Sequence, residues 1–103
     1  MRTVWKFLLE LADEQEVLIP RGASPLAVAA QEDGWGNTHI VLWCLVDSLD
    51  APKKWRIRVA GTGHQINDNF GVDEYIGTAL SRTARTSMDG GRLVWHIFGR
   101  RVE

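Results

Sequence analysis

Residues 54–60 alternate between large apolar side chains and polar or small ones, and this period of two constrains the fold more than any other feature of the sequence. Side chains of a β-strand point in turn to opposite faces, so the alternation predicts a strand with one buried face. The face expected to be buried carries Trp55, Ile57 and Val59, and the opposite face carries Arg56, Arg58 and Ala60. We expect the other strands to pack around this one.

Further segments show a comparable strand signal, namely 3–9, 16–19, 26–31, 39–46, 74–80 and 93–98. A helix is the alternative over the first of these, because residues 7–16 include good helix formers. Residues 39–46 are apolar on both faces, which indicates a central strand covered on both sides or a strand inside a closed barrel. Gly77 is expected at a bulge or a close approach of two strands.

About seven strands joined mostly by hairpins predict an all-β fold, either an antiparallel β-sandwich or a small barrel. In both alternatives Trp43 and Trp55 would be buried in a single core. The chain has 103 residues, which is enough for one domain, 1–103. Residues 65–73 are expected to form a long loop, and Ser81 to Arg92 an excursion that ends in a hairpin turn.

The composition excludes several classes of protein. The 12 basic and 13 acidic residues give a net charge of −1, which disfavours a nucleic-acid-binding protein with a general basic surface, although a local basic patch is still allowed. The one cysteine, Cys44, permits no internal disulfide, and its apolar surroundings predict a buried, unreactive thiol. No segment is apolar over enough residues to span a membrane, and the N-terminus alternates like a strand, so we expect a cytoplasmic protein.

The most conspicuous polar cluster is the turn Gly61-Thr62-Gly63-His64, which follows the alternating strand. Its backbone amides could cradle an anion beside the titratable His64, or its glycines could simply permit a turn. His39, His64 and His96 have no spacing typical of a zinc site, and no nucleophile or pair of carboxylates shows catalytic spacing. We therefore expect no metal, no cofactor and no enzymatic activity.

Arginine and tryptophan suggest a binding surface instead. Arg56 and Arg58 project from one strand face, where they could form a basic patch with Arg82 and Arg85 or could pair with acidic neighbours. Trp35 lies between two glycines in a hairpin loop. It could be an exposed anchor for a protein partner or a plug for the open end of a barrel.

The chain resembles a family of small uncharacterised β domains common in phage and prophage genomes. The motifs that carry the resemblance are Trp-Lys at 5–6, Ile-Pro-x-Gly-Ala at 19–23, Trp-x-Leu-Val-Asp at 43–47, Arg-Ile-x-x-x-Gly-Thr-Gly-His-x-Ile at 56–66, Tyr-Ile-Gly-Thr at 75–78 and Asp-Gly-Gly-x-Leu-Val-Trp-His-Ile-Phe at 89–98. The resemblance implies a compact β domain in a phage or prophage setting, and it implies no activity. The Trp35 loop and residues 81–87 look longer than in that family, and enlarged loops are common sites of binding.

The leading hypothesis is therefore a phage or prophage accessory protein that binds a host or phage protein and could inhibit a host defence system. One alternative is a small-anion or nucleotide-binding domain that uses Gly61 to His64. The other is a structural module that forms a homodimer through an uncovered strand edge.

Overall fold

The computed structural model describes residues 1–63, 74–82 and 92–102. All regular structure in this part of the chain is β, which confirms the all-β prediction and rules out the helical alternative near the N-terminus. The strands are β1 (Arg2–Leu9), β2 (Gln15–Pro20), β3 (Ser24–Glu32), β4 (Thr38–Asp47), β5 (Pro52–Gly61), β6 (Glu74–Arg82) and β7 (Arg92–Arg101).

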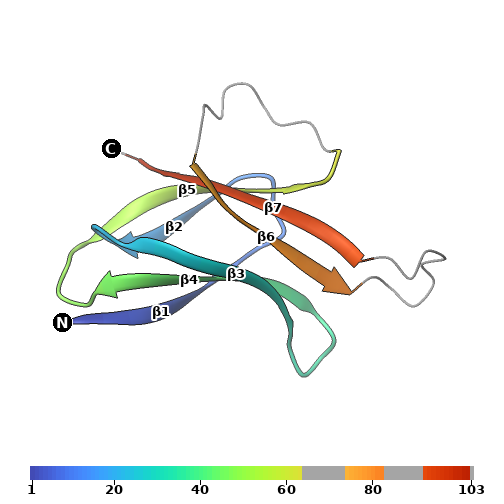
Figure 1. Cartoon of the computed structure of the whole chain (residues 1–103), viewed down its shortest axis with the longest axis horizontal. Coiled ribbons are helices and arrows are strands. Elements are labelled where there is room, and N and C mark those ends of the chain that lie inside the picture. Colours follow the sequence, from blue (N-terminus) through green and yellow to red (C-terminus); the bar gives the residue numbers. More distant parts are fainter. Residues whose placement is uncertain (64–73, 83–91, 103) are drawn as a thin grey trace.

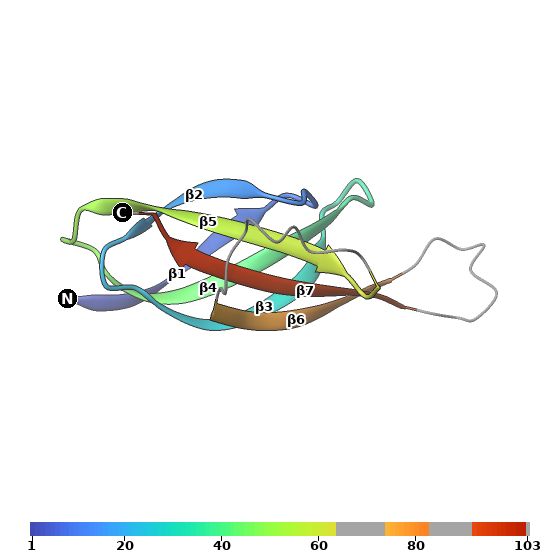
Figure 2. The same cartoon turned by 90° about the horizontal axis from the view of Figure 1, so that it is seen from above.

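The strands form two antiparallel sheets that pack face to face as a sandwich (Figures 1 and 2). One sheet has the order β1-β4-β3 and the other the order β2-β5-β7-β6. Of the two predicted architectures the sandwich is therefore correct, and the closed barrel is not. The predicted central strand β5 does lie inside its sheet, between β2 and β7.

The core lies between the two sheets, and strand alternation decides which residues enter it. β4 contributes Ile40, Leu42, Cys44 and Val46, all almost completely buried. From the opposite sheet, β5 contributes Trp55, Ile57 and Val59, as the sequence predicts. Because these side chains come from both inner faces, their burial holds the two layers together.

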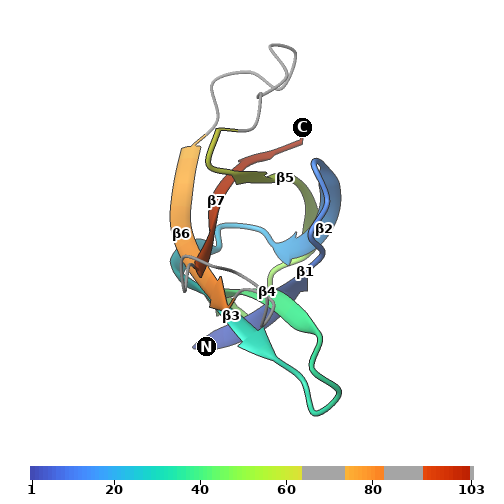
Figure 3. The ribbon, with the colours of Figure 1, turned by 90° about the vertical axis from the view of Figure 1, so that its right-hand side faces the viewer.

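The two sheets meet along β3 and β6, which lie side by side in the view along the sandwich (Figure 3). Gly77 of β6 allows this close approach, since a Cβ atom at that position would lie 2.6 Å from Cγ2 of Val28 on β3. The pairing of β6 with β7 shifts register between Tyr75 and Gly77. The predicted bulge and close approach at Gly77 are both confirmed.

The outer face of β4 differs from the prediction that this strand is covered on both sides. Val41, Trp43 and Leu45 point away from the core residues of the same strand, and the second sheet packs on the other face. Val41 is nevertheless completely buried, with Leu8 of β1 and Ala29 of β3 as its neighbours in register. Trp43 is therefore only partly buried and does not share the core with Trp55, which corrects the prediction of a single core for both.

Three predictions fall wholly or partly outside the described residues. These are the loop over 65–73, the conformation of the chain between Arg82 and Arg92, and the hairpin turn at 89–91. Within the described part of the chain, no helix is long and apolar enough to cross a membrane.

Candidate functional site

Trp35 stands at the tip of the hairpin that joins β3 to β4, with 90 % of its surface exposed. Gly34 and Gly36 flank it, and Gly36 has a φ of +81°, a conformation that glycine adopts without strain. The structure thus supports the exposed alternative for Trp35 and contradicts the plug.

Asp33 organises the loop beneath Trp35. Its Oδ1 atom accepts hydrogen bonds from the backbone N–H groups of Trp35 (2.8 Å) and Asn37 (3.0 Å). The Asp33 backbone N–H donates to the Asn37 carbonyl at 2.9 Å, and the Gly36 N–H donates to the Asp33 carbonyl at 3.2 Å. Four hydrogen bonds therefore hold the five residues 33–37 in one conformation.

The same carboxylate ties the loop to β4. Its Oδ2 atom lies 3.1 Å from Nε2 of His39, and the Asn37 side-chain amide lies 3.4 Å from the same oxygen. The hydrogen bond from the Asn37 backbone, followed by the contacts with His39 and Trp35, lowers the pKa of Asp33 to about 2. At neutral pH the carboxylate is thus ionised and accepts all of these hydrogen bonds.

Sequence reasoning missed Asp33, although a signal was present. An Asp whose side chain accepts from a backbone N–H two residues later is typical of tight turns, and the sequence Asp-Gly-Trp-Gly-Asn offers that arrangement. The result is an indole presented to solvent on a loop that is already ordered. Such a side chain can enter a partner's pocket with little loss of conformational entropy.

A second exposed side chain offers a comparison with Trp35. Leu49 is 86 % exposed in the turn between β4 and β5, and the Oδ1 atom of Asp47 accepts from its backbone N–H at 3.0 Å. That hydrogen bond is the main reason that the pKa of Asp47 is lowered. One turn precedes β4 and the other follows it, so the β4–β5 turn and the Trp35 loop lie at opposite ends of this strand (Figure 1).

The predicted glycine turn is described only as far as Gly63, because His64 lies outside the described residues. Gly63 has a φ of +85°, which confirms that a glycine is needed there. Thr62 Oγ1 lies 2.9 Å from Nε2 of His96, and Thr78 Oγ1 lies 3.1 Å from Nδ1 of the same ring. His96 therefore links the end of β5 to β6, and anion binding by the turn stays a prediction.

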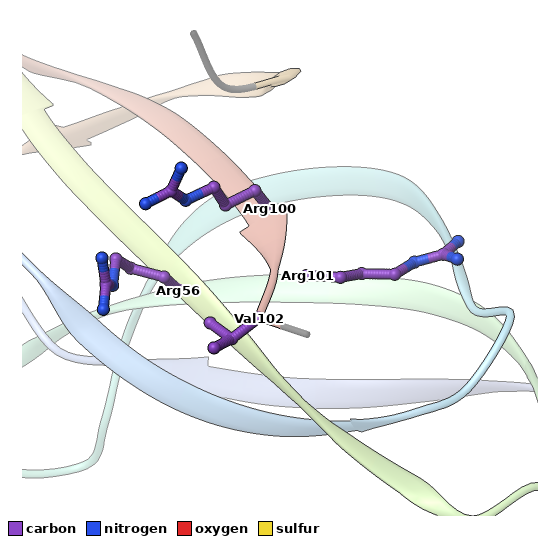
Figure 4. Close-up of a pocket in the computed structure, with 4 residues that line it drawn as sticks. All are labelled: Arg56, Arg100, Arg101 and Val102. Atoms are coloured by element: carbon purple, nitrogen blue, oxygen red, sulfur yellow. The ribbon is translucent and has the colours of Figure 1, made fainter. Parts of the chain in front are cut away.

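The predicted arginines lie on the outer face of the second sheet, but in different environments. Arg58 is only 4 % exposed, and its Nη1 atom lies 3.9 Å from a carboxylate oxygen of Glu14, a partner that the sequence did not indicate. Arg56 is partly exposed and lines a cavity of about 340 Å³ with Arg100, Arg101 and Val102 (Figure 4). These arginines and Trp35 belong to different sheets, so the structure does not bring them together.

The other candidate arginines cannot be placed in a patch. Arg82 ends β6, but its side chain lies outside what the structure describes, as does the whole of Arg85.

Cys44 is buried in the core, and burial raises the pKa of its thiol to about 11. This agrees with the predicted unreactive thiol. Among residues 1–63, 74–82 and 92–102, no group of three or more His, Cys, Asp and Glu side chains is arranged to hold a metal ion.

The fold and the exposed hairpin define a small all-β sandwich domain with a protruding aromatic side chain. A family model for a domain of unknown function, DUF7352, matches residues 1–103, and the chain belongs to this family. No curated protein and no solved structure matches the chain.

Proposed function

We propose that the protein is a binding module that recognises another protein through Trp35. The observation that supports this proposal is the 90 % exposure of a tryptophan on a loop that Asp33 holds in place. Leaving an indole in water is unfavourable, whereas tryptophan is among the residues that dominate protein–protein interfaces. The partner would offer an apolar pocket that takes the indole ring.

The free energy gained by burying the Trp35 indole is large enough for specific recognition. Complete burial of a tryptophan removes about 150 to 250 Å² from water, which is worth about 4 to 6 kcal/mol before the cost of association. Because the loop is already ordered, little of this gain is lost to fixing its backbone. We expect Trp35→Ala to weaken binding by about 2 kcal/mol or more, which is a factor of about 30.

We further propose a phage or prophage setting for the protein and a host or phage protein as its partner, which could include a component of a host defence system. This part of the proposal derives from the sequence motifs at 5–6, 19–23, 43–47, 56–66, 75–78 and 89–98.

The experiment is a comparison of three tagged baits at micromolar concentration in host lysate: the wild type, Trp35→Ala and Leu49→Ala. Leu49 is the matched control, because it is also highly exposed in an Asp-capped turn. Any partner recovered by the wild type is purified, and its Kd for each bait is measured by calorimetry. Loss of affinity in Trp35→Ala together with unchanged affinity in Leu49→Ala supports the proposal. Equal affinities for all three baits, or no specific partner of the wild type, contradict it.

Self-association is the second candidate function, and the position of Trp5 favours it. β1 is an edge strand of its sheet, and Trp5 pairs in register with Cys44, which places it on the core side. It is nevertheless 41 % exposed. Antiparallel pairing of two β1 strands centred on Trp5 would bury both indoles, whereas pairing centred on Lys6 would oppose two positive charges.

This second candidate predicts a dimer whose formation depends on residue 5. Light scattering from about 10 µM to 1 mM would show dimerisation of the wild type and a monomer for Trp5→Lys, which places like charges at the two-fold axis. A wild-type monomer over the whole range would contradict it. Neither result bears on the Trp35 surface, which lies on the β3–β4 hairpin.

A further inference from the structure

The side of the three-stranded sheet that faces away from the core is apolar and uncovered. Its inner side packs on the second sheet, and no strand of the described part of the chain lies on the other side (Figure 3). An apolar sheet face is normally buried against a second layer of helices or strands. Strand register places eight residues at the middle of this outer side, which we call the apolar face: Val4, Lys6 and Leu8 of β1, Val41, Trp43 and Leu45 of β4, and Ala27 and Ala29 of β3.

The apolar face is open to solvent over much of its area. Leu8 is 61 % exposed and Val4 is 51 % exposed. Ala27 is also exposed, and Trp43 is partly exposed. These side chains are contiguous, because Trp43 lies in register between Lys6 of β1 and Ala27 of β3. A contiguous exposed apolar patch, unlike a single exposed apolar residue, is typical of an interaction site.

Lys6 is the one charged residue of the apolar face. It lies at the centre, since its register partner Trp43 is the middle outward residue of β4. Lys6 is exposed, and the ion pairs formed among the described residues do not include it. Burial of an ammonium group is costly unless a carboxylate pairs with it. A complementary occupant of this face therefore carries a carboxylate opposite Lys6.

A second copy of the chain does not meet this requirement. In a two-fold symmetric contact each copy presents the same residues to the other, and the eight residues of the apolar face include no Asp or Glu. The face is also small. Three strands about 4.8 Å apart and the five residues 41–45 at about 3.3 Å each cover about 240 Å², whereas a stable interface needs about 800 Å² on each partner. The charge and the size of the face thus fit a small element of another protein.

The secondary structure of that element follows from what a sheet face offers. The face presents side chains only, because the backbone hydrogen bonds of β4 are made within the sheet to β1 and β3. An extended segment would leave its own backbone groups without partners there, whereas a helix satisfies them internally. A helix with its side chains is about 10 to 12 Å wide, which matches the width of three strands, about 14 Å.

From these observations we propose that the apolar face binds an amphipathic helix of a partner protein, with an acidic residue of the helix beside Lys6. The length of residues 41–45, about 17 Å, corresponds to about three helical turns. Apolar side chains at positions i, i+3 and i+7 of the helix would contact Leu8, Trp43 and Leu45. A contact of this size belongs to the transient class. The proposal depends neither on the Trp35 surface nor on pairing of two β1 strands.

The test is a titration of the full chain with two designed helical peptides up to about 1 mM, a range that covers transient binding. Both are alanine-rich, about 18 residues long so that they form helices, and carry leucine at i, i+3 and i+7. One has Glu at i+4 and the other has Lys. Two-dimensional amide NMR is the readout. We expect saturable shifts confined to residues near 4–8, 27–29 and 41–45, with about fivefold tighter binding of the Glu peptide.

Variants locate the contact. Lys6→Glu should reverse the preference, so that the Lys peptide binds more tightly. Leu8→Glu should weaken binding at least tenfold, because it places a charge in the apolar contact. Leu18→Glu is the matched control and should bind like the wild type, because Leu18 is 60 % exposed on β2, an edge strand of the other sheet. Val4→Glu replaces Leu8→Glu if circular dichroism shows that the latter has lost its fold.

Several outcomes would overturn the proposal. They are the absence of saturable shifts with both peptides, equal affinities for the two peptides, and unchanged binding in Leu8→Glu. Shifts near 27–29 and 41–45 that depend on protein concentration alone, and that Leu8→Glu removes, would show that a second copy occupies the face. Sedimentation of the chain with neutral phosphatidylcholine vesicles, again removed by Leu8→Glu, would assign the face to a lipid surface. Either result would replace the helix as the occupant.

Discussion

Gly77→Ala tests whether the two sheets depend on a close contact between β6 and β3. The added Cβ would lie 2.6 Å from Cγ2 of Val28, whereas ordinary carbon contacts lie at 3.5 to 4.0 Å, so one strand must move by about 1 Å. Val28 cannot turn away cheaply, because a β-branched side chain is stiff at χ1. Overpacking of this kind costs about 1 to 3 kcal/mol. For a domain of this size, 2 kcal/mol corresponds to a fall in Tm of about 8 to 16 °C.

Urea denaturation of a double-mutant cycle isolates this contact. Val28→Ala alone should cost about 1.5 kcal/mol for its two lost methyl groups, but it also makes room for the new Cβ. We therefore expect Gly77→Ala/Val28→Ala to be more stable than the sum of the single effects by about 1 to 2 kcal/mol. Gly34→Ala is the matched control, with no atom within 4 Å of its added Cβ and an expected change within about 0.5 kcal/mol. Additive single effects, or a neutral Gly77→Ala, would refute the reasoning.

Three further predictions concern polar and titratable groups. Asp33→Ala should speed amide hydrogen exchange in the Trp35 loop. The pKa of Asp33 is lowered from 3.8 to about 2, so the ionised carboxylate stabilises the loop above that range. In the wild type, exchange in the loop should therefore become faster only as the pH falls from about 4 toward 2. Exchange unchanged in Asp33→Ala would contradict the role of this carboxylate. The Cys44 thiol should react with a thiol reagent at pH 8 about 200-fold more slowly in the native protein than in urea. The reason is that a pKa of about 11 leaves only about 0.1 % of the native thiol as thiolate at this pH. Equal rates would show that the thiol is not buried. Thr78→Val should lower the free energy of unfolding by about 1 kcal/mol in urea titrations, because it removes the hydroxyl group that contacts both His96 Nδ1 and the Tyr75 hydroxyl, whereas Thr78→Ser should keep the wild-type stability.

The alternation of apolar and polar side chains along the sequence was sufficient to predict the strands and to identify the inner face of β5. It could not show which face of β4 the second sheet would cover, because both faces of that strand are apolar. Val41 is completely buried next to its register neighbours Leu8 and Ala29, although it lies on the face of β4 opposite to the second sheet. Trp43 lies on this outer face, so its apolar character was misleading as a sign of the core.

The candidate sites were predictable where they depend on local sequence. Trp35 between two glycines was recognisable as a loop tip, and the Asp33 turn could have been recognised in the same way. The arginine cavity was not predictable, because Arg56 and Arg100 are 44 residues apart in the chain (100 − 56) and meet only through the register of β5 and β7. Burial of Arg58 beside Glu14 likewise depends on how the chain before β2 lies against β5.

The order of strands in the second sheet has a consequence for synthesis on the ribosome. β6 is made before β7, yet its neighbour within the sheet is β7, which lies between β6 and β5. Until the last strand has emerged, a nascent chain therefore carries β6 without a backbone partner in its own sheet, and β5 with one side unpaired. Unpaired strand edges promote association between chains. Between translation of Arg82 and release of Arg101, the nascent domain therefore exposes the edges of β5 and β6, which favours misassembly with other chains.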